Sequence, residues 1–136
     1  MAPIRASAEA ATLKGLPMAN PFVHLELSTP DVAKSKDFYS KLFGWTFTDN
    51  DMGNGMVYSM FKPDDGPGGG MFTMTGAPTF WLAYVGVDDI NAATEKATSL
   101  GATVHRGPME VPGHGWMTIL GDPTGATIAL WQPKPA

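Results

Sequence analysis

Hydrophobic and polar residues alternate at the start of the regular part of the chain, over residues 22–28. Every second residue from Val23 to Leu27 is apolar, and His24 and Glu26 occupy the positions between them. An alternation of this kind is typical of a strand with one face toward a core. We therefore predict a strand here, with His24 and Glu26 on the face opposite the aliphatic residues.

A helix is predicted directly after this strand, over about residues 30–43. The segment Thr29–Asp31 combines a capping hydroxyl, a proline and an acidic residue, which favour a helix start. Gly44 fits the left-handed residue that ends many helices. The glycine-rich stretch 63–70 is expected to be a hairpin or loop. Three further strands are predicted over residues 45–48, 56–61 and 71–74.

The same order of one strand, one helix and three strands begins again near residue 79. A shift of 58 residues places Asp31 on Asp89 and Leu42 on Leu100. The second set of elements is predicted over residues 80–87, 88–100, 102–105, 115–120 and 127–131. We therefore predict an α+β protein made of two βαβββ modules, at about residues 21–75 and 79–133 of a single domain that spans 21–136.

Composition narrows the class of protein. The 136 residues are 43% hydrophobic and 16% charged, which suits a folded domain rather than a disordered chain. A net charge of −4 gives little support to nucleic-acid binding, and the absence of cysteine excludes disulfides and thiolate sites. No apolar run approaches the ~20 residues of a membrane span. Residues 1–20 are expected to form a flexible leader of a cytoplasmic protein.

Several spaced motifs carry a resemblance to a known family. His24 lies seven residues before Asp31, the first predicted helix ends with the aromatic and glycine pattern of residues 38–44, and Asp122–Gly125 forms an Asp-Pro-x-Gly turn before the last strand. With the repeat, this resembles the vicinal oxygen chelate superfamily of glyoxalases, bleomycin resistance proteins and extradiol dioxygenases, over roughly residues 21–133. The resemblance implies paired modules whose curved mixed sheets enclose a cleft.

Members of that superfamily take metal ligands from the first and fourth strands of each module. Here only His24 occupies such a position. The other three positions hold Leu82, Met71 and Ala129. The resemblance therefore implies no catalytic metal and no cofactor, because even open sites normally keep three protein ligands. A divalent metal would require a relocated site in which His24 and Glu26 are joined by His114 or by an acid from residues 49–51.

His24 and Glu26 are the candidate catalytic pair, as a general base and the group that orients it; the alternative is a structural role for both. The repeat predicts that Tyr84 faces Glu26. His114 is either a gate at the cleft mouth or a solvent-exposed loop residue. The candidate ligand-binding residues are Tyr58, Met60, Leu82, Tyr84, Trp116, Thr118 and Trp131. If they face inward they form an apolar pocket, and if outward a dimer surface.

Three functions remain open at this point. The first is a protein that binds a small, partly aromatic molecule in an apolar cleft without a catalytic metal. The second is a superfamily enzyme, a lyase, isomerase or dioxygenase, with an altered site around His24 and Glu26. The third is an interaction module. Fourteen aromatic residues and nine methionines also predict a homodimer with an apolar contact, and no nucleic-acid or membrane partner is expected.

Overall fold

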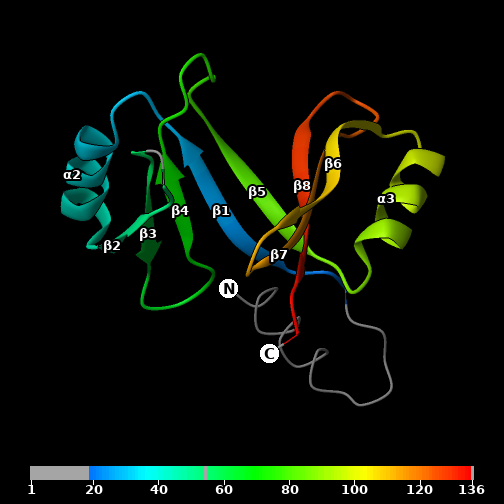
Figure 1. Ribbon diagram of the computed structural model, residues 1–136, viewed down its shortest axis with the longest axis horizontal. Helices are drawn as coiled ribbons and strands as arrows, with labels where there is room; N and C mark the ends of the chain where they lie inside the picture. Colours follow the sequence, from blue (N-terminus) through cyan, green and yellow to red (C-terminus); the bar gives the residue numbers. More distant parts are fainter. Residues whose placement is uncertain (1–18, 54, 136) are drawn as a thin grey trace, which may run out of the picture.

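The computed structural model describes residues 19–53 and 55–135 and shows two successive modules of one helix and four strands each (Figure 1). The predicted leader lies almost entirely outside the described residues. The first module comprises β1 (Phe22–Ser28), α2 (Val32–Phe43), β2 (Thr46–Asp51), β3 (Val57–Lys62) and β4 (Gly69–Phe72). The second comprises β5 (Phe80–Gly86), α3 (Ile90–Ser99), β6 (Thr103–Val111), β7 (Gly115–Gly121) and β8 (Thr127–Pro133).

All eight strands form one mixed sheet in the order β2-β3-β4-β1-β5-β8-β7-β6. The modules join where β1 pairs antiparallel with β5, and each of these strands also pairs in parallel with the last strand of its own module. The two helices lie at opposite sides of the molecule, with the sheet between them (Figure 1). The predicted α+β fold of two βαβββ modules is therefore confirmed, and the sheet stays open rather than closing into a barrel.

Equivalent caps begin the two helices. The side chain of Asp31 accepts a hydrogen bond from the backbone N–H of Lys34 at 3.0 Å, and Asp89 accepts one from Ala92 at 3.0 Å. Gly44 ends the first helix with a φ of 73°, as predicted. Within the described residues, no helix is long and apolar enough to cross a bilayer.

The glycine-rich stretch differs from its prediction, because its last two residues belong to β4. A Cβ on Gly69 would lie 1.8 Å from the backbone oxygen of Leu25, so only glycine lets β4 come this close to β1. Strands β2 and β6 also run further than predicted, to Asp51 and Val111. Their extra residues are held by backbone pairing with β3 and β7, which an alternating side-chain pattern does not report.

The apolar core is divided between the modules. In the first, Leu27, Phe61 and Met71 are buried and pack with partly buried residues of α2 and β2, including Tyr39. The second module's cluster consists of the buried residues Leu82, Tyr84 and Ala129 with the partly buried Met117, Ile119 and Trp131. On the α3 side of the same sheet, the hydroxyls of Thr94 and Thr118 are hydrogen-bonded at 2.8 Å. The helix α3 is therefore held by its own module, whereas α2 also contacts Trp81 of β5 through Tyr39.

Candidate functional site

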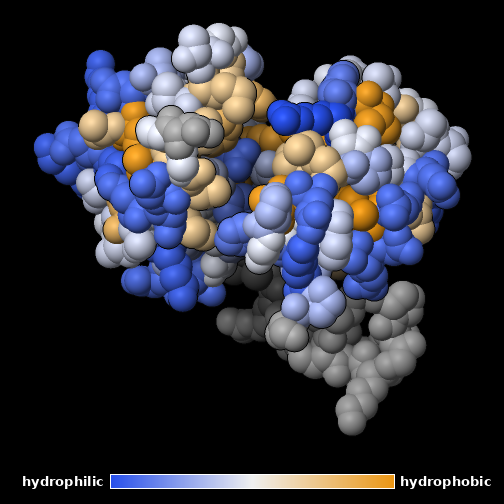
Figure 2. All heavy atoms as spheres, viewed as in Figure 1, coloured by the Kyte–Doolittle hydropathy of each residue, from blue (hydrophilic) through white to orange (hydrophobic). Residues whose placement is uncertain are grey.

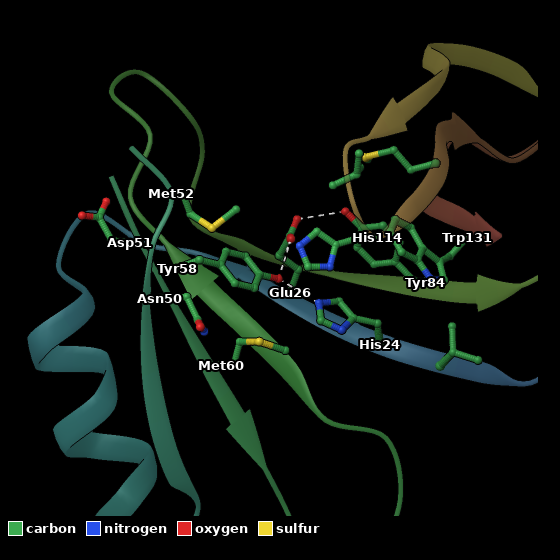
Figure 3. Close-up of a pocket in the computed structure, with 13 residues that line it drawn as sticks. His24, Glu26, Asn50, Asp51, Met52, Tyr58, Met60, Tyr84, His114 and Trp131 are labelled. Carbon is green, nitrogen blue, oxygen red and sulfur yellow. Dashed lines mark hydrogen bonds between the residues drawn. The ribbon is translucent and has the colours of Figure 1, made fainter. Parts of the chain in front are cut away.

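A cavity of about 520 Å³ lies between the two modules, where strands from both contribute its walls. Figure 2 shows the molecule hollowed between its two halves, with hydrophobic side chains along the notch. The apolar lining consists of Val23, Met52, Met60, Val111, Met117 and Trp131. The polar and ionisable lining consists of His24, Glu26, Asn50, Asp51, Tyr58, Tyr84 and His114 (Figure 3).

Four of the polar residues form a connected cluster around the carboxylate of Glu26. Tyr58 donates to one carboxylate oxygen at 2.8 Å, and Tyr84 donates to the other at 3.0 Å (Figure 3). The Nε2 atom of His24 lies 2.8 Å from the hydroxyl oxygen of Tyr58. The prediction from the repeat that Tyr84 faces Glu26 is thus confirmed.

The antiparallel junction explains how these residues meet. His24 stands directly opposite Tyr84 across the β1–β5 pair, so both point to the same face of the sheet. Glu26 lies two residues further along β1 and therefore shares that face. Tyr58 arrives from β3, two strands away, and crosses β4 at Gly70, which is the register partner of Glu26. Two modules are therefore needed to assemble the cluster.

The directions of the hydrogen bonds determine the proton on His24. Tyr58 gives its one hydroxyl hydrogen to Glu26, so its oxygen can only accept from the histidine. His24 must accordingly carry its hydrogen on Nε2, which leaves Nδ1 as an acceptor in the neutral ring. In the described part of the chain, Nδ1 has no hydrogen-bond partner and is not enclosed by protein. This atom is available to a ligand in the cavity.

Burial changes the ionisation of the cluster. Desolvation lowers the pKa of His24 below its ordinary 6.5, and the nearby charge of Glu26 offsets this only in part. Desolvation also raises the pKa values of Tyr58 and Tyr84, and the charge of Glu26 and its hydrogen bonds add to that shift. At neutral pH the histidine is therefore uncharged and both phenols keep the hydrogens that they donate.

Six of the predicted site residues line the cavity. They are His24, Glu26, Tyr58, Met60, Tyr84 and Trp131. His114 also lines it and is an exposed loop residue, so the solvent-exposed reading is confirmed and the role of a gate stays a prediction. The sequence interpretation missed Val23, Asn50, Met52, Val111 and Met117, and it considered Asp51 only as a ligand of a relocated metal. Asp51 and Val111 are the last residues of β2 and β6, which both run further than predicted. Only a correct prediction of the lengths of these two hairpins would have placed them at the cavity.

Three predicted ligand-binding residues lie elsewhere. Leu82 shares the face of Glu26 but is buried in the second core cluster. Thr118 is fully buried and bonded to Thr94 on α3. Trp116 lies on that same side, under the ammonium of Lys134 at 5.3 Å. The 58-residue shift fails in the third strand, because Met117 rather than Trp116 faces the cavity, and a slip of one residue exchanges the two faces of a strand.

The family position on β4 also needs correction. The sequence interpretation assigned this position to Met71, but Met71 packs on the other face with the core under α2. The equivalent of Ala129 is Gly70, because Gly70 pairs with Glu26 in the first module as Ala129 pairs with Tyr84 in the second. Neither Gly70 nor Ala129 offers a donor atom, and Nε2 of His24 is already bonded to Tyr58. The side chains at the family position therefore do not fit a chelated metal. Among residues 19–53 and 55–135, no three His, Asp or Glu side chains gather closely enough to hold an ion.

The amino-acid sequence is similar to those of two curated bacterial proteins. It is 35% identical over 114 residues to "Putative glyoxylase CFP32" of Mycobacterium bovis, covering 79% of this chain and 44% of that protein. It is 36% identical over 127 residues to "Anthracycline biosynthesis protein DnrV" of Streptomyces peucetius, covering 79% of this chain and 45% of that protein. The chain thus spans less than half the length of these relatives.

Solved structures show the same fold at low sequence identity. A hypothetical protein from Bacillus halodurans superposes with a TM-score of 0.70 at 11% identity, covering 87% of this chain and 97% of that one. Methylmalonyl-CoA epimerase from Mycobacterium tuberculosis gives a TM-score of 0.62 at 15% identity, covering 93% of this chain and 96% of that one. The model of the glyoxalase/bleomycin resistance protein/dioxygenase superfamily matches residues 22–130. The chain belongs to this superfamily.

Proposed function

We propose that this protein binds a small, partly aromatic molecule in the cavity between its modules and does so without a catalytic metal. The observation that carries the proposal is the 520 Å³ cavity with its methionine, valine and tryptophan walls and one polar cluster. Ligand sites are commonly of this size and composition, with few polar groups that orient the ligand. Methionine side chains adapt readily to a flat apolar surface.

The hydrogen bonding of Glu26 favours binding over chemistry at this carboxylate. Both of its oxygens already accept from tyrosines whose pKa values are raised, so these donors stay in place at neutral pH. A carboxylate held in this way supports a fixed arrangement of Tyr58 and Tyr84. The cluster therefore serves to orient a ligand against the apolar walls.

The name of the Streptomyces relative supports an aromatic ligand. That protein is named for anthracycline biosynthesis, and anthracyclines are polycyclic aromatic compounds. This chain spans only 45% of that protein, so we do not assign the ligand of that protein to this one. What the relative contributes is the class of molecule to test first.

A thermal-shift titration with simple naphthalenes tests the binding function. Binding to the folded state should raise Tm in a saturable way. Met60→Glu places a charge on the cavity wall and should abolish the shift. Met74→Glu is the matched control, since the two methionines are 45% and 46% exposed and Met74 is not among the residues that line the cavity. Equal shifts in both variants would contradict the proposal.

A second candidate function is proton transfer by a lyase or isomerase. The observation that favours it is the neutral imidazole of His24, whose Nδ1 is open to the cavity and could remove a proton. The test is exchange of an acidic C–H in deuterium oxide, followed by NMR on 2-oxoaldehyde hemithioacetals and thioesters. Exchange that requires protein and is lost in His24→Phe would make this the preferred function.

We also propose that the protein forms a homodimer through the α2 apolar face, which comprises Phe38, Leu42, Phe43 and Trp81. Their side chains are 37–57% exposed, and Tyr39 links the aromatic members through ring contacts at 5.0–6.0 Å. The curated relatives are more than twice as long as the region that they share with this chain.

A further inference from the structure

Several polar atoms left open in the cavity lining are hydrogen-bond acceptors. Nδ1 of His24 is one of them. Asn50 uses one of its two amide hydrogens on the backbone oxygen of Thr48 at 3.4 Å, which leaves the side-chain oxygen and one N–H. Asp51 uses one carboxylate oxygen on the N–H of Gly53 at 2.8 Å, which leaves the other. Each of these acceptor atoms calls for a donor on the ligand.

The donors of the polar cluster are consumed within the protein. Both tyrosine hydroxyls donate to Glu26, and the N–H of His24 donates to Tyr58. The donors left in the described lining are one amide N–H of Asn50, the indole N–H of Trp131 and a ring N–H of His114, and none of them belongs to the cluster. A ligand that only accepts hydrogen bonds would therefore cover Nδ1 of His24 without giving it a partner, which costs affinity.

The charges of the lining residues also favour an uncharged ligand. Glu26 and Asp51 are both in the lining, and no lysine or arginine is among the described residues that line the cavity. Arg106 on β6 is exposed and acts on Tyr84 from outside the lining. An anionic ligand would thus meet two carboxylates without a cation in the wall.

We infer that the ligand is an uncharged aromatic molecule that bears hydroxyl donors, a phenol, and that carboxylate and phosphate ligands are excluded. This inference rests on the proposed binding function and specifies its ligand class. The phenolic hydrogen is donated to Nδ1 of His24, while the ring lies against the methionine and tryptophan walls. Coenzyme A thioesters, which carry several phosphate charges, do not fit such a lining.

Three naphthalenes of nearly equal size test the inference by calorimetry at pH 7.5. They are 2-naphthol, which has a donor, 2-methoxynaphthalene, which has only an acceptor, and 2-naphthoate, which is an anion. One hydrogen bond lost with its acceptor left unpaired predicts about tenfold weaker binding of the methyl ether than of naphthol. Naphthoate should bind more weakly than either.

Two variants locate the effect. His24→Phe removes the acceptor, so naphthol and its methyl ether should bind equally well. Asp51→Asn keeps an acceptor oxygen but removes a charge from an exposed residue, so the affinity for naphthoate relative to that for naphthol should rise several-fold. Circular dichroism establishes that each variant is folded. Should His24→Phe not fold, the comparison of naphthol with its ether in the unaltered protein decides alone.

The possible failures are distinguishable. If none of the three compounds binds, the proposed binding function is overturned and the inference falls with it. If all bind but the methyl ether equals naphthol, the binding function stands and the phenol inference is wrong. Tightest binding of naphthoate would overturn the argument from charge.

Discussion

The phenol ring of Tyr58 occupies the space that a side chain at Gly70 would need. A Cβ built on Gly70 would lie 2.1 Å from two ring carbons of Tyr58 and 2.4 Å from its hydroxyl oxygen. Gly70 is also the strand neighbour of Glu26, the acceptor of that hydroxyl. The bare backbone at this position therefore lets Tyr58 cross β4 and reach both Glu26 and His24.

Gly70→Ala should displace Tyr58 and break its bonds to the cluster. We expect a loss of about 1–3 kcal/mol in the free energy of unfolding, as for other overpacked sites. Urea denaturation measures it. In the double variant with Tyr58→Ala the added methyl has room, so the combined cost should be smaller than the sum of the two single costs. Strictly additive costs would show that the ring and the glycine are not coupled.

Tyr58→Phe keeps the ring but removes the hydroxyl. It leaves one oxygen of Glu26 and Nε2 of His24 without their partner, and we expect a cost of about 1–3 kcal/mol. The control is Tyr39→Phe. The hydroxyl of Tyr39 accepts one exposed hydrogen bond from Trp81 at 3.2 Å, so its removal should change stability little. Equal urea midpoints for the two variants would contradict the role of the cluster.

The lowered pKa of His24 predicts a pH dependence of stability. The unfolded chain binds a proton near pH 6.5, whereas the folded chain binds it only at lower pH. Stability should therefore be fully present above pH 6.5 and decline as the pH falls below it. In His24→Phe the decline of Tm between pH 7 and about 5 should be shallower. His105→Phe, on the exposed part of β6, should keep the original slope.

The dimer proposal predicts that one charge on α2 separates the subunits. Light scattering at tens of micromolar should give twice the mass of one chain, and Leu42→Lys should give the mass of a single chain. The repeat supplies the control: Leu100 is the equivalent residue near α3 and is 68% exposed, against 57% for Leu42. Leu100→Lys should remain dimeric. A single-chain mass for the unaltered protein would rule out the proposal.

The donor set around His24 predicts a weak response to divalent metals. Gly70 and Ala129 provide no ligand atoms, so millimolar Mn²⁺, Ni²⁺ or Zn²⁺ should shift Tm only slightly. Elemental analysis after dialysis is the second measurement. Stoichiometric metal that disappears in His24→Ala would overturn this prediction and would favour an enzyme.

Much of the fold was determined locally and could be predicted from the sequence. The stop at Gly44 and the repeated order of elements each depend on residues close together in the chain. The helix caps were each predicted slightly too early, because the structure uses Asp31 rather than the hydroxyl of Thr29, and Asp89 rather than Asp88. The same repeat correctly predicted that Tyr84 faces Glu26, because the pairing of β1 with β5 puts both residues on one face of the sheet. Local patterns of this kind survive folding unchanged, since they are set by backbone geometry and capping.

The tertiary structure alone decided which side chains reach the cavity. Alternation divides a strand into two faces but does not say which one faces the cavity, and the one-residue slip in β7 put Met117 there instead of Trp116 and Thr118. The position of Tyr58 depended on Gly70, which lies twelve residues later in the chain. Gly70 belongs to β4, the strand between β3 and β1. Such contacts are made only when separate strands meet, so no local pattern records them.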